Sequence, residues 1–310
     1  MKKKATTVIL ILVFFLGLSL LLYPSISDWY NSYHQSRVVV SFAEAVSRVN
    51  DEEYREMMDA AQDYNRRLAI EDRLGERLTA EQLDDYESQL DITGTGIMGY
   101  IEIHKIRCIL PIYHGIDDGV LQIAIGHIPW SSLPIGGAGS HSVLSGHRGL
   151  PSARLFTDID KLDEGDTFII RTMNKVLTYE VDQIRIVQPN ETYDLRIIPG
   201  EDLCTLVTCT PYGVNTHRLL VRGHRVENDI PNAANITADA LLYKPYYVAP
   251  IVAAPILLIL FIMMLITTSS GYRQRKEAAR KRAFDALSDL TEEDEDEDYA
   301  EEQDEENIHY

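Results

Sequence analysis

Short runs of apolar and β-branched residues, separated by turn residues, fill the middle of the chain. They predict strands at residues 98–103, 108–113, 142–146, 166–171, 177–186, 204–209 and 218–225. A series of short strands with turn signals between them is typical of an all-β sandwich or barrel. We therefore expect a mainly β domain over residues 98–230, with short helical inserts such as one at residues 155–162.

A helical period precedes this domain. Apolar side chains recur at intervals of three and four at Tyr54, Met57, Met58, Ala61, Tyr64 and Leu68. This stripe predicts helix within residues 41–74 that packs against the domain. Residues 71–95 are polar and poorly periodic, which predicts a linker.

Two apolar stretches flank these regions. Residues 5–22 and 248–267 carry no charged side chain, and each is long enough to cross a bilayer as a helix. Lysines precede the first stretch, and a basic cluster follows the second, which predicts that both ends are cytoplasmic. The alternatives are a cleaved signal peptide for the first stretch and a buried core helix for the second.

These patterns divide the chain into seven segments. They are a basic cytoplasmic N-terminus (1–4), a transmembrane anchor (5–23), an extracytoplasmic helical arm with a polar segment (24–97), the β domain (98–230), a juxtamembrane linker (231–247), a second transmembrane helix (248–268) and a cytoplasmic tail (269–310). The tail is basic at first and acidic afterwards.

Charge and cysteine content narrow the function. The net charge is −19, but residues 292–306 hold 12 acidic side chains and no basic one, so this tail is expected to be disordered. The remaining Lys and Arg are scattered or juxtamembrane, which argues against nucleic-acid binding. Three cysteines are too few for a disulfide framework, although a bridge between Cys108 and Cys204 remains open. The glycine-rich loop at residues 132–140 is followed by no Gly-Lys-Ser/Thr, which excludes a nucleotide site of that type.

A thiol, an imidazole and a guanidinium lie at the ends of three predicted strands. Cys209 ends one strand before a Pro/Gly/Asn turn, Arg218 begins the next, and His147 follows a strand between two glycines. A nucleophile, a proton carrier and an oxyanion stabiliser are the groups that acyl transfer needs. Taken singly each is weak, because other histidines are equal candidates on composition: His127, His141, His217 and His224.

Longer motifs around these residues carry a family resemblance. Residues 205–209 (TLVTC), with Arg218 downstream, resemble the signature of sortases, which are membrane-anchored cysteine transpeptidases of Gram-positive bacteria. Residues 98–103 (MGYIEI), 133–151 (LPIGGAGSHSVLSGHRGLP) and 208–218 (TCTPYGVNTHR) are similar to the class C group, which assembles pili. The resemblance implies a closed eight-stranded β-barrel over the β domain.

The resemblance also implies the chemistry. Cys209, His147 and Arg218 would be catalytic, and Thr208 would support the substrate or the oxyanion. The substrate would be a pilin or surface protein with an LPXTG-like signal, cleaved between Thr and Gly through a thioester. The acyl group would pass to a pilin lysine amine or to a cell-wall amine, with no metal or cofactor. A thiol endopeptidase and an inactive membrane tether remain as alternatives.

One departure from the family concerns the lid. Class C sortases usually carry an Asp-Pro-aromatic motif before the catalytic domain, and residues 70–83 contain no proline and no aromatic residue. Asp72 is a candidate for the lid carboxylate that reaches Arg218, and a solvated linker is the alternative. We therefore expect Cys209 to be less covered than is usual in the family.

Overall fold

The computed structural model describes residues 2–71, 74–228, 257–263, 271, 274–275 and 277–284. The chain divides into two units. Residues 18–244 form the larger one, and residues 1–17 with 245–310 form the smaller one. All strands of the described residues belong to the larger unit.

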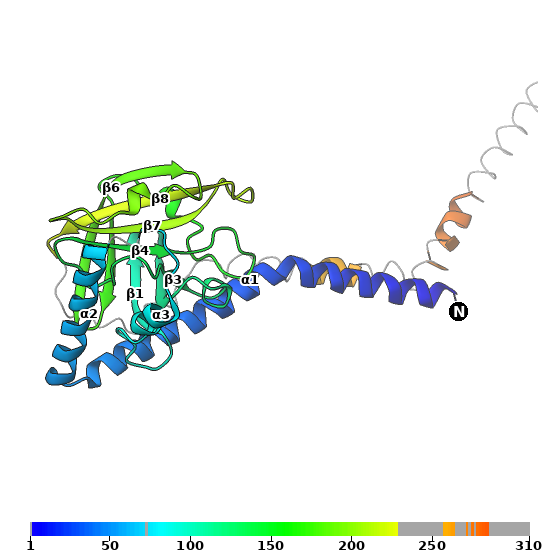
Figure 1. The fold of residues 1–310 in the computed structure, drawn as a ribbon. Helices are drawn as coiled ribbons and strands as arrows, with labels where there is room; N and C mark the ends of the chain where they lie inside the picture. Colours follow the sequence, from blue (N-terminus) through cyan, green and yellow to red (C-terminus); the bar gives the residue numbers. More distant parts are fainter. Residues whose placement is uncertain are drawn as a thin grey trace, which may run out of the picture. The chain divides into compact units, whose positions relative to one another are not determined.

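A closed barrel forms the centre of the larger unit (Figure 1). Its strands are β1 (Ile97–Ile103), β2 (Cys108–His114), β3 (Ile125–His127), β4 (Ser140–Ser145), β5 (Thr167–Thr172), β6 (Lys175–Val187), β7 (Asp202–Thr210) and β8 (His217–Val226). They follow the order β1-β2-β3-β4-β7-β8-β6-β5 around the barrel. The pairs β2–β3 and β4–β7 are parallel and the others are antiparallel. The expected closed eight-stranded barrel is confirmed.

Short helices connect the strands, so the expected helical inserts are present. They are the α-helix α4 (Asp118–Leu121) and the 3₁₀ helices η1 (His104–Ile106), η2 (Ile159–Lys161) and η3 (Tyr193–Leu195).

Strand alternation fills the barrel interior with apolar side chains. Ile101 and Leu206 are fully buried there. β1 is buried on both faces, because the helix α1 (Lys2–Arg48) packs against its outer face, where Phe42 meets Tyr100. Burial of such apolar surface is the main force that holds the arm to the barrel.

The helix α2 (Asp51–Glu71) packs on the barrel through the predicted stripe. Its buried residues are Met58, Ala61, Tyr64, Asn65 and Leu68. The side chain of Asn50 accepts hydrogen bonds from the backbone N–H of Glu52 (3.0 Å) and Glu53 (2.9 Å), which is a typical helix start. The helical pattern within residues 41–74 therefore belongs to two helices with a break before Asp51.

Residues 71–95 were expected to be a linker, and the structure corrects this expectation. They contain the helix α3 (Ala80–Glu87). The Thr79 hydroxyl accepts from the Gln82 N–H (3.3 Å), and the Gln82 side chain accepts from the Thr79 N–H (2.9 Å), which forms a capping box. Tyr86 is fully buried and anchors the helix. One buried tyrosine and a cap, rather than an apolar stripe, hold this helix in place.

Two histidines are buried within polar networks. The Nδ1 atom of His127 lies 2.9 Å from the Tyr86 hydroxyl, and Nε2 lies 2.8 Å from the Ser132 carbonyl oxygen. His141 contacts the Arg196 carbonyl through Nδ1 (2.8 Å) and the Thr205 hydroxyl through Nε2 (2.7 Å). Burial lowers the pKa of His127 to about 3 and that of His141 to about 4. Both side chains are therefore neutral when the protein is folded near neutral pH.

Acid is expected to destabilise the larger unit through these histidines. In the unfolded chain a histidine titrates near 6.5, so between pH 6.5 and about 4 the unfolded state binds protons that the folded state excludes. Lowering the pH from 7 to 5 should cost about 2 kcal/mol for each buried histidine. Urea unfolding of the full chain in detergent, followed by tryptophan fluorescence, measures this loss.

Single-residue variants distinguish the contribution of His141 from the general destabilisation of the protein by acid. His141→Gln should be less stable at pH 7 but should lose about 2 kcal/mol less than the wild type between pH 7 and pH 5. His104→Gln is the control, because the His104 side chain is 66% exposed. Equal losses in the wild type and in His141→Gln would show that the His141 prediction is wrong.

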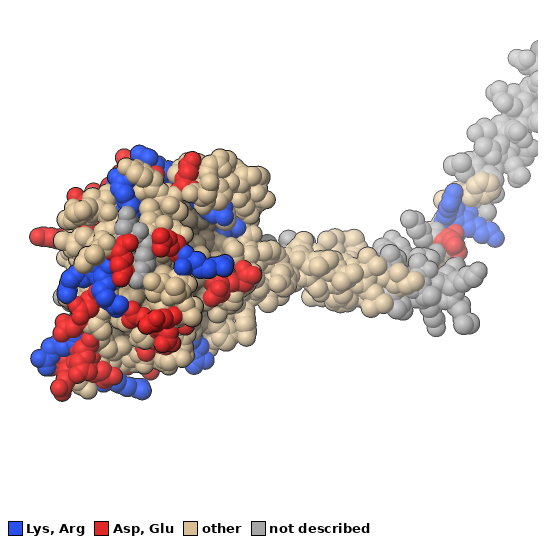
Figure 2. Space-filling view, viewed as in Figure 1, with Lys and Arg blue, Asp and Glu red and all other residues tan. Residues whose placement is uncertain are grey.

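The smaller unit holds residues 5–17 of the first expected membrane span and the described part of the second. Among the described residues, one helix is long and apolar enough to span a membrane, Ile11–Arg48, with a mean hydropathy of 1.8 over its most apolar 18 residues. Figure 2 shows charged side chains of both signs over the barrel and its helices, and none along the apolar part of α1 that is coloured. Of the expected second span, 248–268, residues 257–263 are helical and the others lie outside the described residues. The rings of Phe14 and Phe15 lie 5.4 and 5.3 Å from that of Phe261.

Candidate active site

Cys209 and Arg218 lie opposite each other across the β7–β8 pair. Their Cα atoms are partners in the antiparallel register, and directly opposed residues project from the same face of a sheet. The Arg218 Nη1 donates to the carbonyl oxygens of Asn215 (3.3 Å) and His217 (3.1 Å). Among the described residues its guanidinium has no carboxylate partner. A partly exposed thiol and an available cation therefore share one face of the barrel.

His147 reaches the same place from β4, on the other side of β7 (Figure 1). The parallel pairing of β4 and β7 continues past the end of β4, because the Gly146 N–H donates to the Val207 carbonyl (3.1 Å). The Thr208 hydroxyl donates to the Gly146 carbonyl (2.7 Å). His147 follows Gly146 as Cys209 follows Thr208, so the two residues are level with each other along neighbouring chains. The structure thus brings all three expected catalytic residues into one row.

Thr208, the fourth expected site residue, is placed differently from His147, Cys209 and Arg218. It is 2% exposed, and strand alternation directs it to the face of β7 opposite Cys209. Its hydroxyl is engaged by the Gly146 carbonyl. This hydrogen bond ties Thr208 to the chain that carries His147, and its support of the substrate or the oxyanion stays a prediction.

The two glycines around His147 are explained by aromatic neighbours. A Cβ atom on Gly146 would lie 2.8 Å from the ring of Phe156, which is fully buried. A Cβ atom on Gly149 would lie 2.9 Å from the ring of Tyr212, and its φ of +79° also favours glycine. The loop after β4 is therefore packed closely on two rings, which fixes the path of the backbone on both sides of His147.

The helix α1 supports the same loop. The Asp28 carboxylate accepts from the Arg154 N–H (3.0 Å), and the Asn31 amide donates to the Ser152 carbonyl (2.8 Å). Arg148, next to His147, contacts Asp160 through its guanidinium (2.5 Å). Charge-assisted contacts of this kind hold an irregular loop in one arrangement.

An apolar cluster lies beside the thiol on the outer face of the barrel. Its buried members are Ile128, Val143, Leu195, Val207 and Leu220, and Leu74, Trp130 and Val187 pack against it. Val207 and Leu220 are the cross-strand pair two positions from Cys209 and Arg218, so they share their face. Leu74 therefore packs on an apolar cluster that extends to the residues beside Cys209 and Arg218.

The segment around Leu74 is the region expected to differ from the family lid. Asp72, the candidate carboxylate, lies outside the described residues, so its pairing with Arg218 stays a prediction. The expectation that the Cys209 thiol is less covered than is usual in the family also stays a prediction. Leu74 nevertheless shows that an aliphatic side chain from this segment packs on the cluster that an Asp-Pro-aromatic lid would approach.

Shortening Leu74 should make the thiol more reactive. Leu74→Ala removes apolar contacts with the cluster, and partial burial of a leucine is worth about 1–2 kcal/mol. We expect a bulky maleimide to alkylate Cys209 about five- to tenfold faster in this variant. Leu83→Ala, at a residue that is 38% exposed, is the matched control. Alkylation rates that are the same in wild type and Leu74→Ala would mean that this segment does not cover the thiol.

Two of the other candidate histidines and the other two cysteines are not placed for the reaction, whereas His217 and His224 are partly exposed on β8. His127 and His141 are fully buried with both ring nitrogens engaged. Cys204 points into the core, and burial raises the pKa of its thiol well above the ordinary range. Neither Cys108 nor Cys204 is in a disulfide, so they form no bridge. Within the described residues, no group of three or more His, Cys, Asp and Glu side chains is placed to hold a metal ion.

Comparisons with known proteins agree on one family. A family model described as the sortase domain matches residues 101–226. Sortase D of Bacillus subtilis is 30% identical over 131 residues, and sortase A of Streptococcus agalactiae is 29% identical over 117 residues. The matches cover 41% and 37% of this chain, and 63% and 47% of those proteins. The chain thus spans less than two thirds of the length of these curated relatives.

Solved structures extend the similarity to sortases named C. The crystal structure of sortase C1 from Streptococcus agalactiae is 51% identical, with a TM-score of 0.61, and the match covers 62% of this chain and all of that one. Sortase C from Streptococcus pneumoniae is 38% identical, with a TM-score of 0.56, over 63% of this chain and 99% of that one. Sortase C-1 from Actinomyces oris is 41% identical, with a TM-score of 0.53, over 57% and 99%.

Proposed function

Because the chain belongs to the sortase family of cysteine transpeptidases, we propose that it joins surface proteins through a thioester on Cys209. The observation that carries the proposal is the row of His147, Cys209 and Arg218 at neighbouring ends of β4, β7 and β8. This row holds a nucleophile between a proton carrier and a cation, which is the arrangement that acyl transfer requires.

The first half of the reaction forms the acyl-enzyme. The Cys209 thiolate attacks the Thr carbonyl of an LPXTG-like sorting signal. The partly exposed position of Cys209 at a strand end gives a peptide access. Arg218, held through Nη1 by two carbonyls, directs its other N–H groups at the developing oxyanion. His147 then protonates the departing Gly amine as the Thr–Gly bond breaks.

The second half transfers the acyl group to an amine. A lysine amine of another pilin, or a cell-wall amine, attacks the thioester, and His147 accepts the proton that the amine loses. The Cys209 thiolate leaves, and an amide or isopeptide bond remains. No residue other than this row has to change its protonation state.

A pilin substrate is the more specific part of the proposal. The Streptococcus pneumoniae sortase C structure, which is 38% identical, was described with regard to its pilin substrate specificity, and the solved relatives at 38–51% identity include several sortases named C. The α1 helix provides an apolar stretch suited to anchoring the enzyme in the membrane. We propose that the catalytic unit is extracytoplasmic, that the expected second span completes a double anchor, and that both termini lie in the cytoplasm.

Polymer formation tests this function. The full chain in detergent is incubated with a purified pilin that carries an LPXTG-like signal and an acceptor lysine, and the products are separated on denaturing gels. We expect ladders that resist boiling, and their loss in Cys209→Ala. Cys108→Ala, which changes another partly exposed cysteine that is in no disulfide, is the control and should give wild-type ladders. Cleaved but unlinked pilin would instead show hydrolysis, and no product would contradict the proposal for that pilin.

A further inference from the structure

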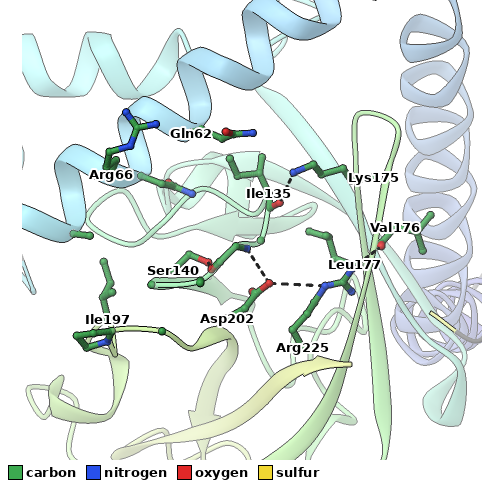
Figure 3. A pocket seen from close by; sticks show the side chains of 18 of the residues that line it. Gln62, Arg66, Ile135, Ser140, Lys175, Val176, Leu177, Ile197, Asp202 and Arg225 are labelled. Carbon is green, nitrogen blue, oxygen red and sulfur yellow. Dashed lines mark hydrogen bonds and ion pairs between the residues drawn. The ribbon is translucent and has the colours of Figure 1, made fainter. Parts of the chain in front are cut away.

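A pocket lies at the opposite end of β7 from the Cys209 thiol. It has a volume of about 990 Å³. Its walls come from α2, the glycine-rich loop at residues 136–139, the β5–β6 turn and residues 197–200 (Figure 3). Asp202, the first residue of β7, lines it, whereas Cys209 lies near the other end of the strand. The pocket is therefore separate from the proposed active site.

Positive charge predominates among the lining residues. Arg66, Lys175 and Arg225 contribute cations, and Asp202 is the one carboxylate of the lining. The carboxylate is already engaged, because it accepts from the Gly137 N–H (2.8 Å), and it also accepts from the Tyr179 hydroxyl and lies 3.8 Å from Arg225. Figure 3 shows Asp202 directed toward Arg225 rather than toward Lys175. Asp202 therefore has its closest ion pair with Arg225 rather than with Lys175.

Lys175 is a lining cation for which the described part of the chain provides no ion pair within contact distance. Its ammonium donates to the Ile135 carbonyl (3.1 Å), and among the described residues this is its only hydrogen-bond acceptor. An ammonium has three N–H donors. Burial lowers the pKa of Lys175, because removing a cation from water is costly, and the charge of Asp202 offsets part of this effect. A bound anion would supply acceptors and charge together.

The remaining walls are suited to a polar group attached to that anion. Gln62 on α2 and Asn174 in the β5–β6 turn line the pocket, and no hydrogen bond within the described residues engages their amides. Asn65, by contrast, is engaged on both sides by the backbone of Leu133. The volume far exceeds that of a bare phosphate or carboxylate. Free amides beside a cation suit the hydroxyls of a polyol or sugar.

We propose that this pocket binds a polyol phosphate, with the phosphate on Lys175 and the hydroxyls on Gln62 and Asn174. Arg66, on the α2 wall, adds positive charge, although it also contacts Asp63 (2.5 Å). The same chemistry occurs in soluble or polymeric glycerol phosphate and in the headgroup of phosphatidylglycerol. The site would give a membrane-anchored enzyme an attachment point that does not depend on Cys209.

Glycerol phosphate is the probe that tests the site. Its binding to the full chain in detergent is measured by titration calorimetry. We expect saturable binding that is at least about tenfold weaker in Lys175→Gln, because a charge-assisted hydrogen bond is lost. Arg66→Gln and Asn174→Ala should each weaken binding about threefold. Lys161→Gln, at a lysine whose side chain is 60% exposed and which lies outside the pocket, and Cys209→Ala should bind as the wild type does.

Lipid nanodiscs separate the two sources of the phosphate. The same titration is done in phosphatidylcholine alone and in a mixture with phosphatidylglycerol. Weaker binding of glycerol phosphate in the mixture, seen in the wild type and absent in Lys175→Gln, would assign the pocket to the lipid headgroup. Equal binding in both lipids would assign it to soluble or polymeric glycerol phosphate. No saturable binding in either lipid, or equal affinity of the wild type and all three pocket variants, would overturn the proposal.

Discussion

Arg218→Lys is expected to lower kcat/KM for a sorting-signal peptide by about 10²–10³-fold, the usual cost of removing an oxyanion donor. Lysine keeps the charge but replaces the planar fork of N–H donors by a single ammonium. In the structure two backbone carbonyls hold one nitrogen of the guanidinium, and only a fork can keep these contacts while it donates to an oxyanion opposite Cys209. Release of the peptide fragment, followed by chromatography, measures the effect.

The control for Arg218 is Arg185→Lys. Arg185 belongs to β6, is 55% exposed and contacts Asp194, so its replacement should leave kcat/KM within about twofold, as is usual for a surface ion pair. An Arg218→Lys variant that retains nearly all activity would show that a positive charge alone is sufficient. The oxyanion role assigned to the fork would then be wrong.

His147→Gln should reduce kcat by about 10²–10⁴-fold, because proton transfer to the leaving amine is lost. The loss should fall on kcat rather than on KM, since His147 is level with Cys209 along neighbouring chains and does not belong to the apolar cluster. Alkylation of Cys209 by a small reagent should continue, which separates lost proton transfer from a collapsed site. His104→Gln, with a 66% exposed side chain, is the control and should keep full activity. Equal kcat values for His147→Gln and the control would exclude proton transfer by His147.

The strand pattern was readable from the sequence because burial enforces alternation. The strand β7 carries a nearly continuous run of β-branched and apolar residues, and β8 places Leu219 and Val221 on one face and Arg218 and Arg222 on the other. The strand β3 was missed, because Ile125–His127 is too short to show a period. The helix α3 was also missed, although Thr79 and Gln82 form a capping-box spacing that could have revealed it. Patterns along the sequence therefore reveal elements that have a clear period, and they miss short elements such as β3 and α3.

The site was only partly readable for a different reason. The family motifs identified His147, Cys209 and Arg218 as candidates. No local pattern, however, shows that β4 and β7 pair in parallel, with the register that aligns His147 with Cys209. The same limit applies to Leu74, which acquires its role by packing on strands distant in sequence. The Lys175 pocket depends on four separate segments meeting. Each of these three features depends on contacts between segments that are distant in sequence. Such contacts leave no pattern within any one segment.

The most direct test of the account is to trap the acyl-enzyme. The full chain in detergent is incubated with an LPXTG-containing peptide and no amine acceptor, quenched in acid, digested and examined by mass spectrometry. The account predicts that the fragment with Cys209 gains the mass of the peptide portion that ends in Thr, and that hydroxylamine removes this mass. An unmodified Cys209 beside released Gly-containing peptide, or acylation at Cys108 instead, would contradict it.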